Sequence, residues 1–392
     1  MRSPSLPNGR LKVLAVTAEP HPYIVRQIAA LSKHTHVRYV SLNNRDLLPL
    51  IGRRMGPVIV FSFLAFARLI RNRVVPLGPR FLVQLLLQSS YLMLLDRDEH
   101  FDIFHAYWLY PSAIACLIAR RKQTKIVAAV CGYDLQGDRE TRYGALLHPL
   151  KSLLSQKALC TADVIVTSFE IHSQTALRMV GTEMPGRIVF IPSCVDVKAI
   201  RAAVITRGKT REPLILFAPR VSELYGAVEF VEAALRLLRD HAETSFVLAG
   251  DGSLRNKLAK RVRSLGRDGR IRFTGRVSHT DFLGLISEAS IVCDLASPGQ
   301  GATTLEAQAL GRVVVGVSGP KRLIIDGKTG ILVPRGNTNE LFLALKRLLS
   351  DKDEADRMAH QAYTSVVKNH DISLVVGKTL QIYDSLVQRL SR

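Results

Sequence analysis

The chain has 392 residues, and 47% of them are hydrophobic, which is ordinary for a globular protein that buries a core. Its 54 Lys and Arg against 33 Asp and Glu give a formal net charge of +21, which favours an anionic partner such as a membrane surface or a phosphorylated substrate. Nucleic acid is excluded from the expected partners, because the basic runs carry no interleaved aromatic residues and no base-reading motif.

Short apolar strands alternate with helical patterns over the first half of the chain. Strands are predicted at 11–17, 37–42, 103–105, 126–130, 164–167 and 188–191, and helices at 23–32, 112–120 and 171–180. This alternation is typical of βαβ units, whose parallel strands form a sheet covered by helices on both faces.

The segment between Asp46 and Asp96 contains no acidic residue and holds two apolar runs, 55–67 and 81–95. Both runs are shorter than the ~20 residues of a membrane-spanning helix. Two interpretations remain open. Either the runs are core helices, or the segment from Arg53 to Arg80 lies on an anionic membrane surface, with arginines on the phosphate head groups.

Neither a signal peptide nor a disulfide framework is expected. Residues 1–10 lack an apolar stretch, and the cysteines show no CxxC or Cys/His spacing. We therefore expect a cytoplasmic protein, peripheral on the inner face of the cell membrane if the basic segment binds lipid.

A polar, basic stretch at 198–213 is predicted to link two domains, after which the alternation resumes. Strands are predicted at 214–218, 245–249, 271–274, 291–294 and 313–317, and helices at 227–239, 254–264, 281–288 and 305–310. The sequence therefore predicts one Rossmann-like doubly wound domain over 1–205 and a second over 206–372. A final helix, about 373–392, is expected to pack back on the first domain.

Ligands of open parallel sheets bind beyond the carboxyl ends of the strands, so the candidate residues are sought there. Arg220 follows the strand at 214–218, where a guanidinium can bind a diphosphate, although a plain surface arginine is the alternative. Gly250 and Asp251 follow the next strand, in a tight turn that allows a ligand to approach the backbone but does not require one.

The stretch 299–307 joins a strand to an apolar helix. Its small residues Gly301, Thr303 and Thr304 are expected to expose backbone N–H groups that suit a phosphate. Glu306 can accept hydrogen bonds from both hydroxyls of a ribose, or it can simply interact favourably with the helix N-terminus.

Together these stretches resemble glycosyltransferase family 4, retaining enzymes of the GT-B fold, in which two Rossmann-like domains face a cleft. The resemblance runs from Leu11 to about Leu386. It rests on the order and spacing of motifs at 102–105, 132–134, 191–196, 250–252, 273–277, 305–311 and 326–333.

The resemblance implies that the second domain binds a nucleotide-diphosphate sugar and that the first binds the acceptor. Arg220 would stabilise the leaving diphosphate, and Asp134 would lie near the transferred sugar. The implied acceptor side also holds His21, Cys131 and Gly132. The implied donor-binding residues are Gly250, Asp251, Gly275, Val277, Gly301, Thr303, Thr304, Leu305 and Glu306.

The chain departs from the family pattern around the sugar and the diphosphate. Pro298 replaces the first glutamate of Glu-x7-Glu, Tyr225 replaces a lysine, and Cys131 replaces a histidine. Lys321 or Arg322 could restore the lost positive charge, because a charge-assisted contact is worth about 1.5–3 kcal/mol.

We therefore expect a retaining hexosyltransferase that acts on a glycan or lipid-linked acceptor and needs no metal or other cofactor. The Asp-x-Asp patterns at 96–98 and 351–353 are interpreted as solvated surface. Two alternatives stay open: a catalytically degenerate protein that binds nucleotide sugars as a scaffold, and a nucleotide-sugar epimerase.

Overall fold

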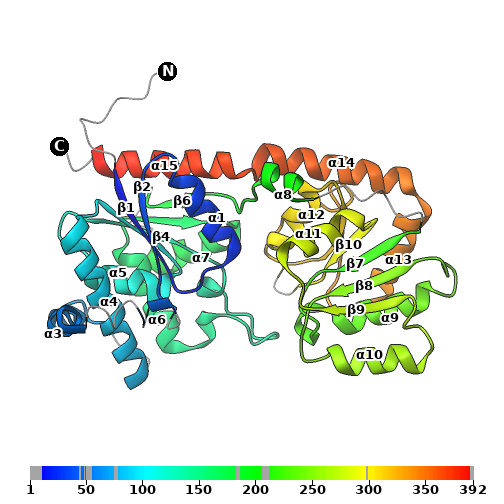
Figure 1. The fold of residues 1–392 in the computed structure, drawn as a ribbon, viewed down its shortest axis with the longest axis horizontal. Coiled ribbons are helices and arrows are strands. Elements are labelled where there is room, and N and C mark those ends of the chain that lie inside the picture. The colour runs from blue at the N-terminus through cyan, green and yellow to red at the C-terminus, as the bar shows by residue number, and fades with distance from the viewer. Residues whose placement is uncertain are drawn as a thin grey trace, which may run out of the picture. The chain divides into compact units, whose positions relative to one another are not determined.

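Each half of the chain builds a six-stranded parallel sheet flanked by helices (Figure 1). The computed structural model describes residues 11–43, 46–47, 49, 55–74, 78–181, 186–204, 212–296 and 299–388. The chain divides into unit 1, Met1–Pro192 with Val375–Arg392, and unit 2, Ser193–Leu374. Both sheets are buried between helices, which explains why their strands are nearly continuous apolar runs.

The sheet of unit 1 has the order β2-β1-β3-β4-β5-β6, so the strand order reverses between β1 and β3. The strands are β1 (Lys12–Thr17), β2 (His36–Ser41), β3 (Ile103–Tyr107), β4 (Lys125–Ala129), β5 (Val164–Thr167) and β6 (Ile188–Phe190). The helices that cover it are α1 (Pro22–Leu31), α3 (Met55–Arg71), α4 (Pro79–Glu99), α5 (Ile114–Ala119), α6 (Pro149–Thr161), α7 (Glu170–Val180) and α15 (Ile372–Gln388).

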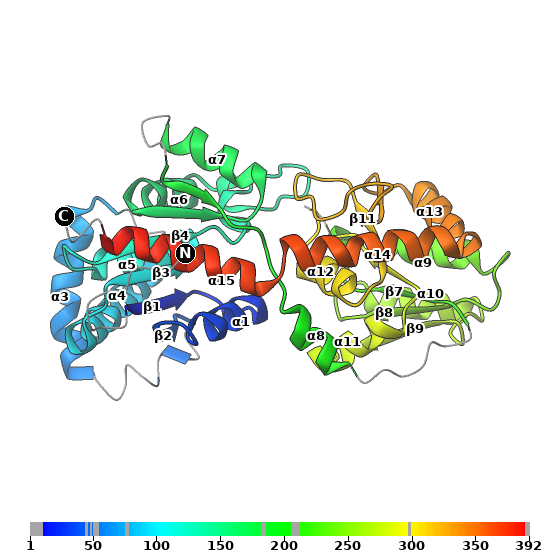
Figure 2. The ribbon, with the colours of Figure 1, turned by 90° about the horizontal axis from the view of Figure 1, so that it is seen from above.

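The C-terminal helix α15 packs on the sheet of unit 1 (Figure 2). Tyr383 of α15 is fully buried, and its hydroxyl is hydrogen-bonded to Nδ1 of His105 on β3 at 2.6 Å. Burial raises the pKa of Tyr383 above its usual range and lowers the pKa of His105 to about 3. A neutral His–Tyr pair therefore joins the C-terminal helix α15 to the central strand β3.

The sheet of unit 2 has the order β12-β11-β10-β7-β8-β9, and its reversal lies between β7 and β10. This is the strand order of dinucleotide-binding sheets. The strands are β7 (Leu214–Phe217), β8 (Ser245–Ala249), β9 (Ile271–Gly275), β10 (Ile291–Asp294), β11 (Val313–Val317) and β12 (Ile331–Val333). The helices are α8 (Val197–Ala203), α9 (Ala227–Leu237), α10 (Arg255–Ser264), α11 (His279–Glu288), α12 (Ala302–Ala309), α13 (Thr338–Ser350) and α14 (Lys352–Asn369).

The stretch 198–213 is not a plain linker. It begins within α8, whose Val197 and Ile200 are buried in the core of unit 2. Asp196 caps this helix, since its Oδ1 accepts a hydrogen bond from the backbone N–H of Ala199 at 2.8 Å. Unit 2 therefore starts at Ser193 and not at 206, while residues 205–211 lie outside the described residues. The polar outer face of a short helix concealed it in the sequence.

The two apolar runs between Asp46 and Asp96 differ in how far they are buried. The run 81–95 lies in α4, which buries Leu85, Leu92 and Leu95, so the core interpretation is confirmed for it. The run 55–67 lies in α3, where one side is buried but Phe63 is 77% exposed. The core interpretation is therefore wrong for the outer side of α3.

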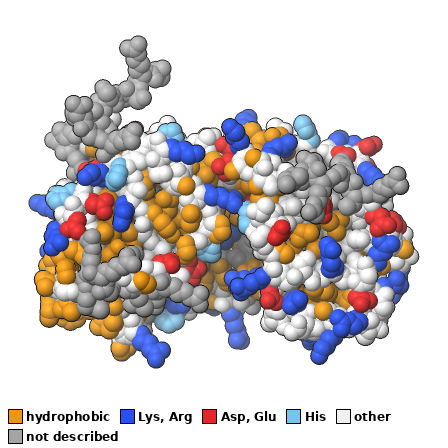
Figure 3. Space-filling view, viewed as in Figure 1, with side chains coloured by type: hydrophobic (Ala, Val, Ile, Leu, Met, Phe, Trp, Pro, Cys, Tyr) orange, Lys and Arg blue, Asp and Glu red, His pale blue; other side chains and the backbone are white. Residues whose placement is uncertain are grey.

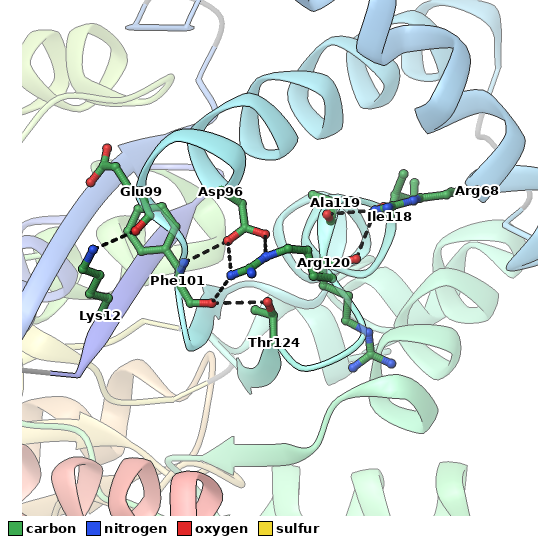
Figure 4. A network of polar contacts seen from close by, with 10 residues as sticks. Lys12, Arg68, Asp96, Glu99, Phe101, Ile118, Ala119, Arg120 and Thr124 are labelled. Carbon is green, nitrogen blue, oxygen red and sulfur yellow. Dashed lines mark hydrogen bonds and ion pairs between the residues drawn. The ribbon is translucent and has the colours of Figure 1, made fainter. Parts of the chain in front are cut away.

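The interpretation of 96–98 as solvated surface is wrong for Asp96. This residue is only 1% exposed, and its carboxylate accepts hydrogen bonds from Nε of Arg121 at 2.7 Å and from the backbone N–H of Phe101 at 2.9 Å (Figure 4). Asp96 thus ties the end of α4 to the turn after α5, a contact between residues distant in the sequence. Asp98 and Asp351 are exposed, as predicted.

Candidate functional site

The candidate donor residues of unit 2 follow the carboxyl ends of its strands, on both sides of the reversal between β7 and β10. Arg220 lies three residues after β7, and its side chain is exposed. Within the described residues, no carboxylate forms an ion pair with it. Its guanidinium is thus available to an anion at the point of the sheet where ligands of this fold class bind.

The Arg220 loop is held by the loop after β8. The backbone N–H of Val221 donates to the carbonyl of Asp251 at 3.2 Å, and that of Leu254 donates to Val221 at 3.1 Å. A side chain at Gly252 would place its Cβ 2.3 Å from the Val221 carbonyl oxygen, so only glycine fits there. Gly250 makes a bridge to Gly275 at the end of β9. The predicted glycines therefore pack two loops together and position Arg220.

The loop after β9 contains the residues predicted to read the base. Gly275 has a positive φ of 70°, a conformation that favours glycine, and Val277 is half-buried. Ser278 then caps α11, because its Oγ accepts a hydrogen bond from the backbone N–H of Asp281 at 3.1 Å. This cap fixes where the helix begins and hence where the preceding loop ends.

Asp294, at the carboxyl end of β10, organises the turn that leads into α12. It is 3% exposed, and its Oδ2 accepts a hydrogen bond from Oγ1 of Thr304 at 2.6 Å. Burial raises the pKa of Asp294, although hydrogen bonds from Thr304 and from the backbone N–H groups of Ala296, Gly301 and Thr304 oppose the shift.

This arrangement concerns the turn that is predicted to bind phosphate. The backbone N–H groups of Gly301 and Thr304 favour the charged form of Asp294 and so counteract part of the rise in its pKa. Ala302 and Thr303 remain as first-turn residues of α12, whose N–H groups have no acceptor within the helix. Sequence reasoning did not single out Asp294, although an acidic residue that ends an apolar strand was a visible signal.

Gln300 is a second residue that sequence reasoning missed. It is 1% exposed, its Nε2 donates to the carbonyl of Val317 at 2.9 Å, and its Oε1 accepts from the N–H of Leu323 at 2.7 Å. This amide joins the turn before α12 to the loop after β11. The same loop carries the two residues that are predicted to replace the missing positive charge. Lys321 is half-buried and forms a backbone β-bridge with Gly299, whereas Arg322 is exposed.

Glu306 is buried in α12, with 7% of the residue exposed, and its Oε1 lies 2.8 Å from Nε2 of His279 on α11. The side chain of Glu306, which is predicted to bind the ribose, is thus held in one orientation by its contact with the neighbouring helix α11. Leu305 is fully buried in the core of the unit, so its side chain does not face a ligand.

Tyr225 is half-buried and packs against the hydrophobic core of unit 2. The next residue, Gly226, adopts a left-handed conformation at the start of α9, and a Cβ there would lie 2.8 Å from Leu295 Cβ. The structure places Tyr225 on the same loop as Arg220. Pro298 lies outside the described residues.

The corresponding edge of unit 1 is aromatic. His21 follows β1 and Trp108 follows β3, on the two strands between which the order reverses. Their ring centroids are 5.7 Å apart, and His21 stacks on Tyr23 at 5.9 Å. Trp108 is partly buried, and its indole Nε1 is buried without a hydrogen-bond partner in the described part of the chain.

Tyrosines extend this edge after β4, and sequence reasoning did not assign them. Tyr133 and Tyr143 pack edge to face at 5.3 Å, and Nζ of Lys151 donates to the Tyr133 hydroxyl at 3.2 Å. Burial raises the pKa of Tyr110, which is hydrogen-bonded to Tyr133. The run Tyr107-Trp108-Leu109-Tyr110 at the end of a strand was the signal in the sequence.

Asp134 is 1% exposed and holds its own loop together. Its Oδ2 accepts from the backbone N–H of Cys131 at 3.1 Å, and its carbonyl accepts from Oγ of Ser155 at 3.1 Å. Gly132, with a φ of 118°, makes the sharp turn between them. Burial raises the pKa of Tyr23, whose hydroxyl is hydrogen-bonded to Cys131. The predicted acceptor-side residues therefore lie together in unit 1.

Residues 203–365 match the family model described as Glycosyl transferases group 1. Residues 203–365 are thus similar to a glycosyltransferase group 1 domain. The matched stretch contains Arg220, Glu306 and the other predicted donor residues of unit 2. In the part of the chain that the structure describes, no cluster of three His, Cys, Asp or Glu side chains is arranged to hold a metal ion.

The relatives in sequence are glycosyltransferases. The chain is 34% identical over 193 residues to an alpha-D-kanosaminyltransferase of Streptomyces kanamyceticus, a match that covers 48% of this chain and 50% of that enzyme. It is 26% identical to a glycogen synthase of Mycobacterium tuberculosis, over 74% of this chain and 70% of the relative. It is 35% identical to an N-acetylgalactosaminyltransferase of Campylobacter jejuni named for a PP-undecaprenol-linked glycan, over 37% and 40%. The chain thus spans about half the length of the first relative.

Solved structures confirm the GT-B fold. A glycosyltransferase of Rickettsia africae superimposes with a TM-score of 0.73 at 17% identity, covering 97% of this chain and 99% of the other. An Anabaena protein in complex with UDP-glucose superimposes with a TM-score of 0.66 at 16% identity, over 96% and 100%. The predicted architecture of two doubly wound sheets is correct.

Proposed function

We propose that the protein is a retaining hexosyltransferase whose unit 2 binds a nucleotide-diphosphate sugar. One observation carries the proposal: Arg220 and the first turn of α12 follow the two strands, β7 and β10, between which the order of the sheet reverses. A guanidinium and free helix N–H groups are the groups that bind a diphosphate and stabilise its charge as it leaves.

Glu306 would hold the ribose of the donor. An ionised carboxylate offers about four lone-pair sites, so Glu306 can accept hydrogen bonds from ribose hydroxyls while it keeps its contact with His279. Gly275 and Val277 would contact the base through their backbone, and Lys321 or Arg322 would add positive charge beside the phosphates. UDP-glucose, found with the Anabaena relative in fold, is the first donor to test.

The aromatic edge of unit 1 supports a carbohydrate acceptor. Partly exposed rings such as Trp108 and Tyr133 offer flat apolar faces, which suit the apolar face of a sugar ring, and Lys151 adds a positive charge. A glycan or a lipid-linked glycan is therefore the proposed acceptor, and the Campylobacter relative is named for the latter class. A peripheral location at the inner face of the membrane would bring the enzyme to such an acceptor.

In the proposed retaining reaction, the departing phosphate takes the proton of the acceptor hydroxyl. Asp134 is buried, so its proposed role is to hold the Cys131–Gly132 backbone beside the transferred sugar. Exclusion of water from the bound donor would protect the activated sugar from hydrolysis.

The test begins with thermal unfolding of the protein in the presence of uridine, guanosine and adenosine diphosphate sugars. A donor at 100 times its Kd stabilises the folded state by about 2.7 kcal/mol, which raises the unfolding temperature. Glu306→Gln should abolish most of this protection, whereas the exposed Glu340→Gln on α13 serves as a matched control.

The second step follows turnover and product stereochemistry. Release of nucleoside diphosphate that depends on a glycan acceptor, with retention of the anomeric configuration by NMR, is expected. Protection without release would favour a scaffold, and conversion of the nucleotide sugar without an acceptor would favour an epimerase. Absence of protection by every donor would overturn the proposal.

A further inference from the structure

Helix α3 of unit 1 has one buried and one exposed apolar side. Val58 and Ala65 are fully buried and Leu69 is 5% exposed, because they pack into the core of the unit with α4 and α5. The opposite side is exposed although it is equally apolar: Ile59 52%, Val60 69%, Phe63 77%, Leu64 43%, Phe66 45% and Ile70 61%. A surface helix of a globular protein normally places polar residues on that side.

Polar contacts fix which side of α3 faces outward. Nη1 of Arg68 donates hydrogen bonds to the carbonyls of Ile118, Ala119 and Arg120 at 3.0–3.1 Å, at the end of α5 (Figure 4). The hydroxyls of Ser62 and Ser90 are 3.2 Å apart, which ties α3 to α4. The exposed side is therefore a stable surface and does not result from a loosely attached helix.

These inward contacts exclude Arg68 from lipid binding. Its guanidinium faces the interior of the unit, and burial lowers its pKa. The sequence hypothesis, which placed the arginines of 53–80 on phosphate head groups, is wrong for this residue.

The exposed apolar side chains form a patch with a basic border. Figure 3 shows hydrophobic side chains gathered at the lower left, over α3. Contiguous patches of this kind mark interaction surfaces. The exposed Arg71 ends the helix, the exposed Arg73 follows it, and Arg80 lies in the first turn of α4, while no acidic residue occurs from 47 to 95.

These features fit a membrane surface better than a protein partner. An anionic bilayer offers an apolar interior beneath negative phosphates, which matches an apolar helix face bordered by arginines. In the described residues no helix is long and apolar enough to cross a bilayer, so α3 is suited to lie along the interface.

We propose that α3 docks unit 1 on an anionic lipid membrane, with Ile59, Phe63, Phe66 and Ile70 entering the acyl boundary. Arg71, Arg73 and Arg80 bind the phosphate head groups. This surface belongs to unit 1 alone and does not depend on the donor site of unit 2. A variant can therefore lose membrane docking and still transfer sugar to a soluble acceptor. Equally, a variant can lose sugar transfer and still dock on the membrane.

The test is flotation of the full chain with vesicles of phosphatidylcholine containing about 30% phosphatidylglycerol. The double substitution Phe63→Ser with Ile70→Ser should weaken binding about tenfold or more, because it removes apolar area that inserts. The control, Leu343→Ser with Val367→Ser, removes exposed apolar side chains of unit 2 and should bind as the wild type does. Equal binding by both variants would overturn the proposal.

Further variants distinguish insertion of α3 into a membrane from its contact with a second copy of the chain. Arg71→Gln with Arg73→Gln should reduce binding to anionic vesicles and lower its sensitivity to salt. Phe63→Trp should shift its fluorescence to the blue with vesicles and be quenched by brominated lipids, whereas Val367→Trp should not respond. If light scattering instead shows a dimer that Phe63→Ser with Ile70→Ser dissociates, and vesicles do not bind, the patch joins two copies and the proposal fails.

Discussion

The two units share an architecture but differ in the chemistry at the point where the strand order reverses. In unit 2 this point carries glycine turns, Arg220 and a helix N-terminus, and the buried Asp294 and Gln300 hold the turn that leads into this helix. In unit 1 it carries rings, among them His21, Tyr23 and Trp108. A diphosphate requires donors and positive charge, whereas a sugar ring requires flat apolar faces. These are the requirements of the donor and the acceptor proposed above, and one fold supplies both kinds of edge.

The largest effect is expected from a substitution of Arg220, at the edge of the unit 2 sheet that is proposed to bind the diphosphate. Arg220→Ala should lower kcat by about 10²–10³, because it removes a donor that acts on charge developing in the transition state. The free energy of unfolding should hardly change, since the side chain is exposed. Steady-state rates with saturating donor are the measurement, and Arg220→Lys should recover part of the activity. An Arg239→Ala control on the surface should be neutral, and a full-rate Arg220→Ala would falsify the role.

Glu306→Gln tests the ribose contact. Loss of a charge-assisted hydrogen bond should weaken donor binding by about 1.5–3 kcal/mol, measured by calorimetry with the nucleoside diphosphate sugar. The variant also changes the contact of residue 306 with Nε2 of His279 on the neighbouring helix. His279→Gln therefore serves as the comparison: it should weaken binding less, because Glu306 itself is kept. If both variants lose the same affinity, Glu306 acts only through helix packing.

Acid should destabilise unit 1 through His105. Burial holds the pKa of this residue at about 3, below the value near 6.5 of an unfolded chain. The neutral ring is therefore favoured in the folded state, and its contribution to stability is lost as the pH falls below about 6.5. At pH 5 the loss relative to pH 7 is about 2 kcal/mol.

His105→Gln should remove this dependence, so the stability difference between wild type and variant should shrink by about 2 kcal/mol between pH 7 and pH 5. Urea unfolding followed by the fluorescence of Trp108, the one tryptophan of the chain, reports unit 1. Tyr383→Phe keeps the buried ring and should retain the pH dependence. Parallel curves for wild type and His105→Gln would contradict the assignment.

The smallest expected effect tests the aromatic edge. Trp108→Ala should raise the KM for a glycan acceptor by a factor that corresponds to about 0.5–1.5 kcal/mol, the usual size of an aromatic stacking contact. Donor affinity should stay unchanged, because the residue lies in unit 1. Trp108→Phe keeps an aromatic ring, so it should retain most of the wild-type affinity for the acceptor. A change in donor Kd without a change in acceptor KM would show that Trp108 does not contribute to acceptor binding.

Much of the donor edge was predictable because it depends on local chain chemistry. The apolar runs that became β7 and β10 located their carboxyl ends, and the residues just after them, Arg220 and 299–306, followed from that placement. The hydrogen bond between the buried Asp294 carboxylate and Oγ1 of Thr304 was not predictable, since it depends on how the buried carboxylate is satisfied. The aromatic edge was missed because its rings come from separate strands.

The sequence by itself determined the two parallel sheets and the glycosyltransferase resemblance, since apolar periodicity and the spacing of turns are written along the chain. Only the tertiary structure decided what each polar and apolar side chain faces. Asp96 became a buried anchor and Phe63 an exposed surface residue, against the expectation for each type, because neighbours distant in the sequence covered one and left the other open. Burial is a property of packing, and periodicity alone does not say which side of a helix is covered.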